Sequence, residues 1–269
     1  MLPFPNIDPV IFSLGPLKIR WYGLMYILGF IAAHLLVRYQ AKQFACKQLL
    51  SLQDNLNLFI IAGVILGGRL GYVAFYNASY YAHHPLEILA TWQGGMSFHG
   101  GCIGVLLAGA LFCWLNRLDY WTTADLYVVT VPIGLGLGRI GNFLNGELFG
   151  RISDVPWAMI FPGGGPLPRH PSQLYEVLLE GVFLFLVLWS VKKRPWQAKY
   201  TNTWPHGSML ALFLILYGIV RCIVEFFREP DPQLGLLMGG MTMGQILSLT
   251  MIITGVLLWQ VRRKVAETS

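Results

Sequence analysis

The sequence predicts an all-α integral membrane protein with about seven transmembrane helices. Hydrophobic residues make up 55% of the 269 residues, charged residues only 12%, and the mean hydropathy is +0.56. These values exclude an ordinary soluble domain. Apolar runs long enough to cross a bilayer recur along the chain. The first run follows no basic leader or small-residue cleavage site, so we interpret it as an uncleaved helix.

Each crossing needs about twenty mostly apolar residues. Runs near that length lie at Trp21–Val37, Leu56–Tyr76, Ser97–Leu115, Leu126–Phe143, Leu174–Val191, Met209–Phe227 and Met241–Val261. We find no internal repeat, low-complexity tract or long linker, which predicts one membrane domain over residues 1–269.

The basic residues between the runs divide unequally between the two sides of the membrane. One side carries Arg38, Lys42, Lys47, Arg117, Lys192, Lys193, Arg194, Lys199, Arg262, Arg263 and Lys264. The other side carries Lys18, Arg20, Arg151, Arg169 and Arg228. By the positive-inside rule the first side is cytoplasmic, which puts the N-terminus outside and the C-terminus inside. The net charge of +6 therefore indicates orientation, since no basic stripe of the kind that binds nucleic acid is present.

Two segments on the predicted outer side have an unusual composition. Residues 77–95 contain no Lys or Arg, and Leu86, Leu89 and Trp92 suit an arm that lies in the membrane interface. Residues 145–171 are rich in Gly and Pro and predict a small external cap.

Charged residues inside the predicted spans are the strongest functional signal. Each costs about 2.5 to 3.5 kcal/mol on insertion scales and indicates a functional site by default. The polar residues expected in the outer half of the membrane are Tyr22, Arg69, His99, Arg139, Glu176, Glu180, Arg221 and Glu225. Spacings of four place Tyr217, Arg221 and Glu225 on one helix face, and Arg139 and Asn142 are neighbours three positions apart.

Arg139 and Arg221 predict a phosphate site, because a guanidinium fork matches phosphate oxygens and few acidic residues are expected at their depth. Arg69 has two open interpretations: it either contacts the substrate or pairs with a glutamate that locks the bundle. His99 lies among the glycines of residues 94–101, where small residues let a ligand or a backbone approach closely.

Six motifs stand out along the chain. They are Trp21–Tyr26, Gly67–Arg69, Gly94–Gly101, Gly138–Glu147, Arg169–Glu176 and Arg221–Arg228. Together they resemble the bacterial prolipoprotein diacylglyceryl transferase family over nearly the whole chain. One departure is the compact external segment between Phe161 and Arg169, which is shorter than in some relatives.

The resemblance implies an enzyme of the bacterial inner membrane, with its active site toward the periplasmic leaflet. Such an enzyme transfers the diacylglyceryl group of phosphatidylglycerol to the thiol of a lipobox cysteine in a prolipoprotein. The reaction forms a thioether and releases glycerol phosphate. It requires no metal, no cofactor and no covalent enzyme intermediate.

The resemblance also implies residue roles, with His99, Arg139 and Arg221 as the catalytic residues. The substrate-binding residues expected around them are Tyr22, Arg69, Asn142, Asn145, Glu147, Tyr217 and Glu225. His99 either takes the proton of the thiol or binds the lipid headgroup. Arg139 and Arg221 are expected to stabilise the charge that grows on the departing phosphate. The four cysteines, Cys46, Cys102, Cys113 and Cys222, have no spacing typical of a zinc site.

A transporter or lipid flippase is the main competing class, since charged residues in a helix bundle also line translocation paths. That class predicts polar groups along the whole depth of the bundle and inverted repeats, and the sequence has neither. An intramembrane serine protease fits less well, because Ser97 lies only two residues from His99 and no Gly-x-Ser-x-Gly elbow is present. A purely structural scaffold would leave the arginines in the spans unexplained.

Overall fold

The helices group into two compact units in the computed structural model. The model describes residues 2–5, 7–15, 17–91, 94–200, 202–229 and 240–268. Unit 1 is Met1–Val37 with Ala124–Ser269, and unit 2 is Arg38–Thr123. The two boundaries fall inside α1 (Trp21–Gln43) and α5 (Tyr120–Val128).

Seven helical stretches of the described chain are long and apolar enough to cross a membrane. They are Trp21–Gln43, Lys47–Tyr76, Phe98–Leu115, Tyr120–Leu144, Ser172–Trp196, Ser208–Glu225 and Met243–Thr268. Each predicted span lies largely within one of these stretches, so the prediction of a membrane protein with seven helical spans is confirmed. The second stretch begins at Lys47 rather than Leu56, because Leu49 and Gln53 on its polar first turns are buried by packing. The direction in which each helix crosses stays a prediction.

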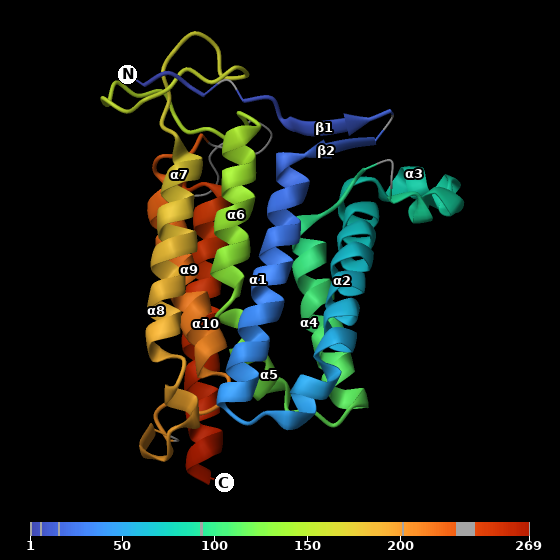
Figure 1. The fold of residues 1–269 in the computed structure, drawn as a ribbon, viewed down its shortest axis with the longest axis vertical. Helices are drawn as coiled ribbons and strands as arrows, with labels where there is room; N and C mark the ends of the chain where they lie inside the picture. The colour runs from blue at the N-terminus through green and yellow to red at the C-terminus, as the bar shows by residue number, and fades with distance from the viewer. Residues whose placement is uncertain are drawn as a thin grey trace. The chain divides into compact units, whose positions relative to one another are not determined.

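Unit 1 is built on four helical stretches that lie beside one another (Figure 1). These are α6 (Val131–Leu144), the continuous stretch α7 (Ser172–Glu176), η3 (Val177–Phe183) and α8 (Leu184–Val191), then α9 (Ser208–Glu225) and α10 (Met243–Thr268). Gly136 of α6 faces Gly181 of η3, and a Cβ on Gly136 would lie 3.2 Å from the Gly181 Cα. This close approach brings the polar residues of α6 and of the α7–α8 stretch together.

Two of the predicted spans contain irregular turns. The predicted span Leu126–Phe143 is interrupted between α5 and α6, where Pro132 lies in the first turn of α6. Proline has no N–H to continue the preceding helix, so it fits a helix start. In the next span, η3 is a π-helical turn inside an otherwise α-helical stretch. The sequence pattern predicted neither break.

Unit 2 packs α2 (Lys47–Tyr76) against α4 (Phe98–Leu115) through facing glycines. A Cβ on Gly67 would lie 2.7 Å from the Gly104 Cα, and a Cβ on Gly71 would lie 2.8 Å from the Gly100 Cα. Both distances are below any real Cβ contact. Glycines four residues apart therefore let the two backbones touch, as in other membrane helix pairs.

Unit 1 also contains strands that the sequence analysis did not predict. β1 (Val10–Leu14) and β2 (Leu17–Arg20) form an antiparallel hairpin. The predicted cap at residues 145–171 is held by isolated bridges, in which Arg169 pairs with both Ile152 and Met159. Such short strands lack the long alternating pattern that reveals a strand in sequence.

The predicted arm of unit 2 is helical in its described part. It consists of α3 (Ala78–His83) and the 3-10 turn η1 (Pro85–Leu89). Leu86 is 86% exposed and Leu89 is 73% exposed, which suits contact with lipid. Trp92, which was expected to anchor this arm, lies outside the described residues.

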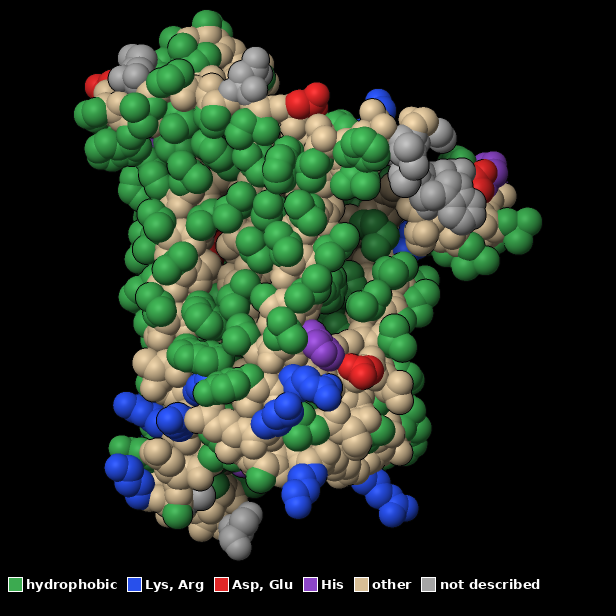
Figure 2. Space-filling model, viewed as in Figure 1, with side chains coloured by type: hydrophobic (Ala, Val, Ile, Leu, Met, Phe, Trp, Pro, Cys, Tyr) green, Lys and Arg blue, Asp and Glu red, His purple; other side chains and the backbone are tan. Residues whose placement is uncertain are grey.

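The surface agrees with a bilayer environment. Apolar side chains cover much of the face seen in Figure 2. Each long helix has exposed large hydrophobic residues. In unit 1, Lys and Arg instead gather beyond the C-terminal end of α8 and along the last turns of α10. Hydrocarbon favours this distribution, because exposed apolar side chains have no cost there while charges do.

Candidate functional site

Arg139 on α6 and Arg221 on α9 converge on the same two carboxylates. The Arg139 Nε is in ion-pair contact with Glu176 and lies 3.9 Å from the Glu180 Oε2. The Arg221 Nη1 lies 3.7 Å from the Glu176 Oε2 and 3.5 Å from the Glu180 Oε1. Because both guanidinium groups contact both glutamates, they face a common point inside unit 1.

Together with Glu225 and Arg228, these four residues form what we call the arginine cluster. The Arg221 Nη2 donates to the Glu225 Oε2 at 2.7 Å, and the Arg228 Nη1 donates to the Glu176 Oε1 at 2.6 Å. Three arginines thus meet three glutamates, and their formal charges cancel. The expectation of few acidic residues at this depth is wrong. The buried carboxylates and the partly buried guanidinium groups compensate each other's charge.

The π-helical turn η3 begins directly after Glu176. Glu176 and Glu180 are both fully buried and bracket the start of this turn. A π-turn inserts an extra residue into the helical ladder and often occurs at functional sites. Here the turn lies where both carboxylates reach the arginines, and Gly181 lets α6 approach on the same side.

The cluster leaves some hydrogen-bond donors open. The Arg139 side chain is 21% exposed, and its contacts are made through Nε alone. Its Nη1 and Nη2 groups, like the Arg221 Nε, have no hydrogen-bond or ion-pair partner within the described part of the chain. Two free amino groups on one guanidinium are what bidentate binding of a phosphate requires.

The end of α6 brings together three predicted site residues. The Asn142 Nδ2 donates to the Glu147 Oε1 at 3.0 Å, and the Asn145 Nδ2 donates to the same oxygen at 3.1 Å. The Gln173 Nε2 donates to the backbone oxygen of Glu147 at 2.7 Å. This network fixes the first residues of the cap against the start of α7.

Tyr22 and Tyr217 belong to the same unit as the cluster. Tyr22 packs on α6 at Gly141, where a Cβ would lie 2.8 Å from the Tyr22 Cδ2. Its hydroxyl is 2.9 Å from that of Tyr26. Tyr217 is half-buried one turn before Arg221 and stacks on Phe213 with ring centroids 5.5 Å apart. The structure therefore supports a shared environment for Tyr217 and Arg221 on one face of α9.

Arg69 holds the arm of unit 2. Its Nε and Nη groups donate to four backbone carbonyls: Ile88 at 2.8 Å, Glu87 at 2.6 Å, Gly94 at 2.6 Å and Gly95 at 3.3 Å. It is only 3% exposed and has no carboxylate partner among the described residues. Of the two open interpretations, pairing with a glutamate is wrong, since backbone carbonyls satisfy the charge instead. These contacts favour a structural role over substrate contact.

His99 lies in the first turn of α4 with an exposed side chain. The side chain of Ser97 caps this helix by accepting from the Gly100 N–H at 3.2 Å. Within the described residues the imidazole makes no hydrogen bond, and its recorded neighbour is the ring of Phe98 at 5.8 Å. The ring is therefore open to a ligand. Since His99 belongs to unit 2, its predicted proximity to Arg139 and Arg221 stays a prediction.

Known proteins match this chain along nearly its full length. A family model described as prolipoprotein diacylglyceryl transferase matches residues 9–261. The chain belongs to this family. A phosphatidylglycerol–prolipoprotein diacylglyceryl transferase of Desulfotalea psychrophila is 61% identical, covering 95% of this chain and 93% of that protein. The proteins of the same name from Geobacter sulfurreducens and Bordetella avium are 54% and 53% identical, over 94% and 96% of this chain and 95% and 96% of theirs.

The resemblance inferred from the six motifs is thus confirmed. The cluster around Arg139 and Arg221 also contains residues that the sequence analysis did not assign to the site. Glu176 and Glu180 were expected in the same layer as Arg139 and Arg221, which they contact, yet no role was given to them. Arg228 was counted only as a basic residue of the outer side. A signal was available for the glutamates, since two carboxylates four residues apart in a span share one helix face. Arg228 has no such signal, because the end of α9 decides which way it points.

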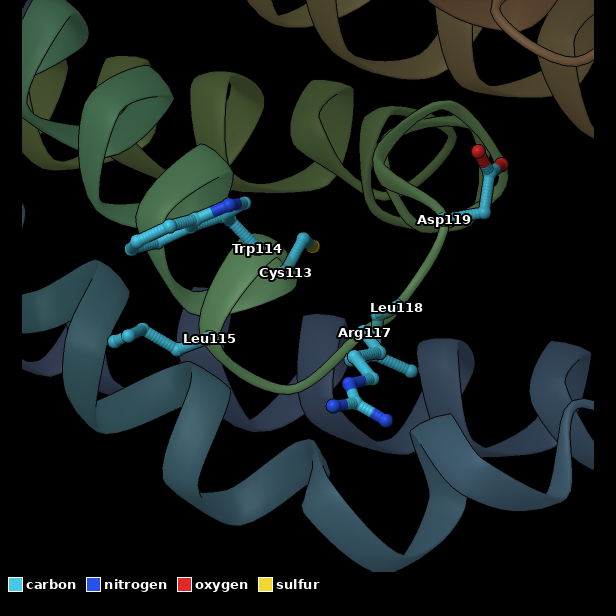
Figure 3. Close-up of a pocket in the computed structure, with 6 residues that line it drawn as sticks. All are labelled: Cys113, Trp114, Leu115, Arg117, Leu118 and Asp119. Atoms are coloured by element: carbon cyan, nitrogen blue, oxygen red, sulfur yellow. The ribbon is translucent and has the colours of Figure 1, made fainter.

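A separate pocket of the transferase chain lies in unit 2, with a volume of about 750 Å³. Figure 3 shows its lining, which comes from the end of α4 and the turn that follows: Cys113, Trp114, Leu115, Arg117, Leu118 and Asp119. A helix rises about 1.5 Å per residue, so His99 and Leu115 are about 24 Å apart along α4. The pocket contains no predicted site residue, and the Asp119 carboxylate caps α5 through the Thr122 N–H at 2.7 Å.

Proposed function

We propose that this chain transfers the diacylglyceryl group of phosphatidylglycerol to the thiol of a lipobox cysteine in a prolipoprotein. Membership of the family makes the chain a transferase of lipoprotein maturation. The single observation that carries the proposed site is the convergence of Arg139 and Arg221 on shared carboxylates, with the amino groups of Arg139 open.

Phosphate binding is the first step of the proposed reaction. The phosphate of phosphatidylglycerol carries one negative charge, and the Nη groups of Arg139 form a fork that matches two of its oxygens. Glu176 and Glu180 hold the two guanidinium groups in place before the lipid arrives. Such preorganised donors need little rearrangement during the reaction and therefore contribute strongly to catalysis.

The transfer step is a displacement at carbon. The cysteine thiolate attacks the glyceryl carbon that bears the phosphate, a C–S bond forms, and the C–O bond to the phosphate breaks. The electron pair of that bond leaves with glycerol phosphate, whose new charge Arg139 and Arg221 stabilise. A thiol has a pKa near 8.5 and is mostly protonated at neutral pH, so a base is needed. His99 takes that proton in this proposal, because its imidazole is exposed and makes no hydrogen bond within the described chain.

The remaining predicted residues support the lipid site. Asn142, Asn145 and Glu147 form one network that orients the polar end of α6, and Tyr22 covers this helix at Gly141. Tyr217 and Glu225 flank Arg221 on α9. Arg69 contributes indirectly by holding the arm that leads into the glycine segment before His99.

We also propose that the chain forms one membrane domain of the bacterial inner membrane, with its active site toward the periplasmic leaflet. The support is the unequal distribution of Lys and Arg, which the positive-inside rule assigns to the cytoplasmic side. In unit 1 the cap and the arginine cluster lie toward one end of the helices, and the basic residues after α8 lie at the other end. Prolipoprotein cysteines would meet the lipid at that depth.

The decisive experiment incubates the purified full-length protein with phosphatidylglycerol vesicles and a lipobox peptide. We expect the peptide mass to rise by one diacylglyceryl group, with equal release of glycerol phosphate. A peptide whose cysteine is alkylated should gain no mass. The unmodified peptide should also gain no mass when the vesicles contain phosphatidylcholine in place of phosphatidylglycerol. Movement of lipid between leaflets without any mass gain would instead identify a flippase.

A further inference from the structure

The start of α10 holds the carboxylate that pairs with Arg221. The Thr242 hydroxyl donates to the Glu225 Oε1 at 3.0 Å, while the Arg221 Nη2 donates to the Glu225 Oε2 at 2.7 Å. Thr242 and Glu225 are both buried, so water does not compete for these hydrogen bonds. Thr242 lies outside all six motifs that revealed the family.

A capping box directs the proton of the Thr242 hydroxyl. The Thr242 Oγ1 accepts from the Gln245 N–H at 3.2 Å, and the Gln245 Oε1 accepts from the Thr242 N–H at 3.0 Å. This reciprocal pair is the usual capping box at a helix start. Since the oxygen of Thr242 already accepts one hydrogen bond, its own proton is free to point at Glu225.

Gly244 makes room for the same carboxylate. A Cβ on Gly244 would lie 2.6 Å from the Glu225 Cδ and 2.7 Å from each carboxylate oxygen. No side chain fits there without displacing Glu225. The carboxylate therefore lies directly over the first turn of α10, where the partial positive charge of the helix N-terminus also stabilises it.

We infer that Thr242 and Gly244 are positioning residues for the transfer reaction. They fix Glu225, and Glu225 in turn fixes the guanidinium of Arg221 against the phosphate. This inference rests on the proposed function. Without the Thr242 hydroxyl or the space at Gly244, Glu225 turns away and Arg221 loses its shortest carboxylate contact.

The test compares diacylglyceryl transfer by the full-length wild type and four variants. Thr242→Val keeps the side-chain shape but removes the hydroxyl, and Gly244→Ala fills the space beside the carboxylate. Each should lower kcat about tenfold, the loss expected for one hydrogen bond to a charged group. Thr242→Ser restores the hydroxyl and should stay within about twofold of the wild type.

Gln245→Ala separates positioning from simple helix capping. It breaks the capping box but leaves the hydrogen bond from Thr242 to Glu225, so it should lower the melting temperature about as much as Thr242→Val. Its transfer rate should nevertheless remain within about twofold of the wild type. Gly244→Ala provides the same comparison if Thr242→Val does not fold.

Two results would overturn the inference. One is full activity in both Thr242→Val and Gly244→Ala. The other is an equal loss of activity in Gln245→Ala and Thr242→Val, which would reduce Thr242 to a cap. Absence of transfer by the wild type itself would instead contradict the proposed function, so the two failures are distinguishable.

Discussion

A buried arginine binds phosphate only if part of its guanidinium stays free after its own charge has been compensated. Arg139 meets this condition, because its ion pairs use Nε and leave both Nη groups without a partner in the described chain. Arg69 does not meet it, since its Nε and Nη groups already donate to four carbonyls. The number of open donors thus separates the two arginines, because it supports the proposed phosphate contact at Arg139 and a structural role at Arg69.

Replacing Arg139 with lysine tests the proposed fork. Lysine keeps the positive charge but presents a single point charge in place of two parallel donors. We therefore expect Arg139→Lys to lose about 100-fold or more in transfer rate, nearly as much as Arg139→Ala. The measurement is the initial rate of peptide lipidation. Full activity of the lysine variant would rule out bidentate binding at this residue.

The role of His99 can be decided by the pH dependence of a variant. His99→Gln retains a hydrogen-bond donor but has no group that takes up a proton near neutral pH. If His99 is the base, the variant should lose about 100-fold at neutral pH. This loss should shrink as the pH rises toward about 9, because the substrate thiol then ionises without help. A loss that is independent of pH would assign His99 to headgroup binding instead.

At the scale of the element, facing glycines decide how closely two helices approach. Gly104 of α4 lies against Gly63 and Gly67 of α2, and a Cβ on Gly104 would lie 3.0 Å from the Gly67 Cα. Gly104→Ala should therefore force α2 and α4 apart and cost about 1 to 3 kcal/mol of stability. Thermal unfolding in detergent measures the effect.

Gly101 on the same helix provides the control. A Cβ there would meet its nearest atom, the Val64 backbone oxygen, at 3.7 Å, which is an ordinary contact. Gly101→Ala should leave the unfolding temperature almost unchanged and can even raise it, since alanine favours a helix more than glycine does. Equal destabilisation by the two variants would contradict the close packing of α2 on α4.

The cap carries a pH-dependent element in His170. Burial lowers the pKa of this imidazole below its usual value of 6.5, and the nearby charge of Asp154 offsets the effect only in part. Its Nδ1 lies 2.9 Å from the Tyr175 hydroxyl, which also accepts from the Trp157 indole at 2.6 Å. The neutral imidazole is thus the form that the folded cap favours.

The sign of the pH effect follows from this lowered pKa. The unfolded cap takes up a proton at His170 near pH 6.5, whereas the folded cap does so only at lower pH. The stability that neutral His170 contributes is therefore fully present above about pH 6.5, the pKa of the unfolded cap, and falls as the pH drops below that value. Limited proteolysis of the cap should become faster as the pH falls from about 7.5 to about 5.5, and this acceleration should be smaller in His170→Gln. An identical acceleration in the variant would assign the effect to other groups.

At the scale of the whole molecule, hydropathy was sufficient to predict the seven helical spans because each must face lipid over its length. The position of Arg139, Arg221 and Glu225 within the helical spans also followed from the sequence, since a charge in an apolar run is visible without any tertiary information. The β1–β2 hairpin, the π-helical turn η3 and the capping box at Thr242 did not. The strands of the hairpin are too short to show an alternating pattern, and the π-helical turn depends on a local ladder that composition does not encode. The capping box does have a sequence signature, Thr-x-x-Gln, but it was not assigned a role.

The orientation of the molecule is the last property that a simple experiment can decide. If the basic residues after α8 lie in the cytoplasm, the cap must lie on the other side of the membrane, because one helical stretch connects the cap to this basic segment. Asp154 in the cap and Gln197 in the basic segment are both exposed, so cysteines there would be reachable by a reagent. In a variant that lacks the four native cysteines, Asp154→Cys should react with a membrane-impermeant maleimide on intact spheroplasts. Gln197→Cys should react only after permeabilisation, and the reverse pattern would place the arginine cluster at the cytoplasmic end, out of reach of an exported prolipoprotein.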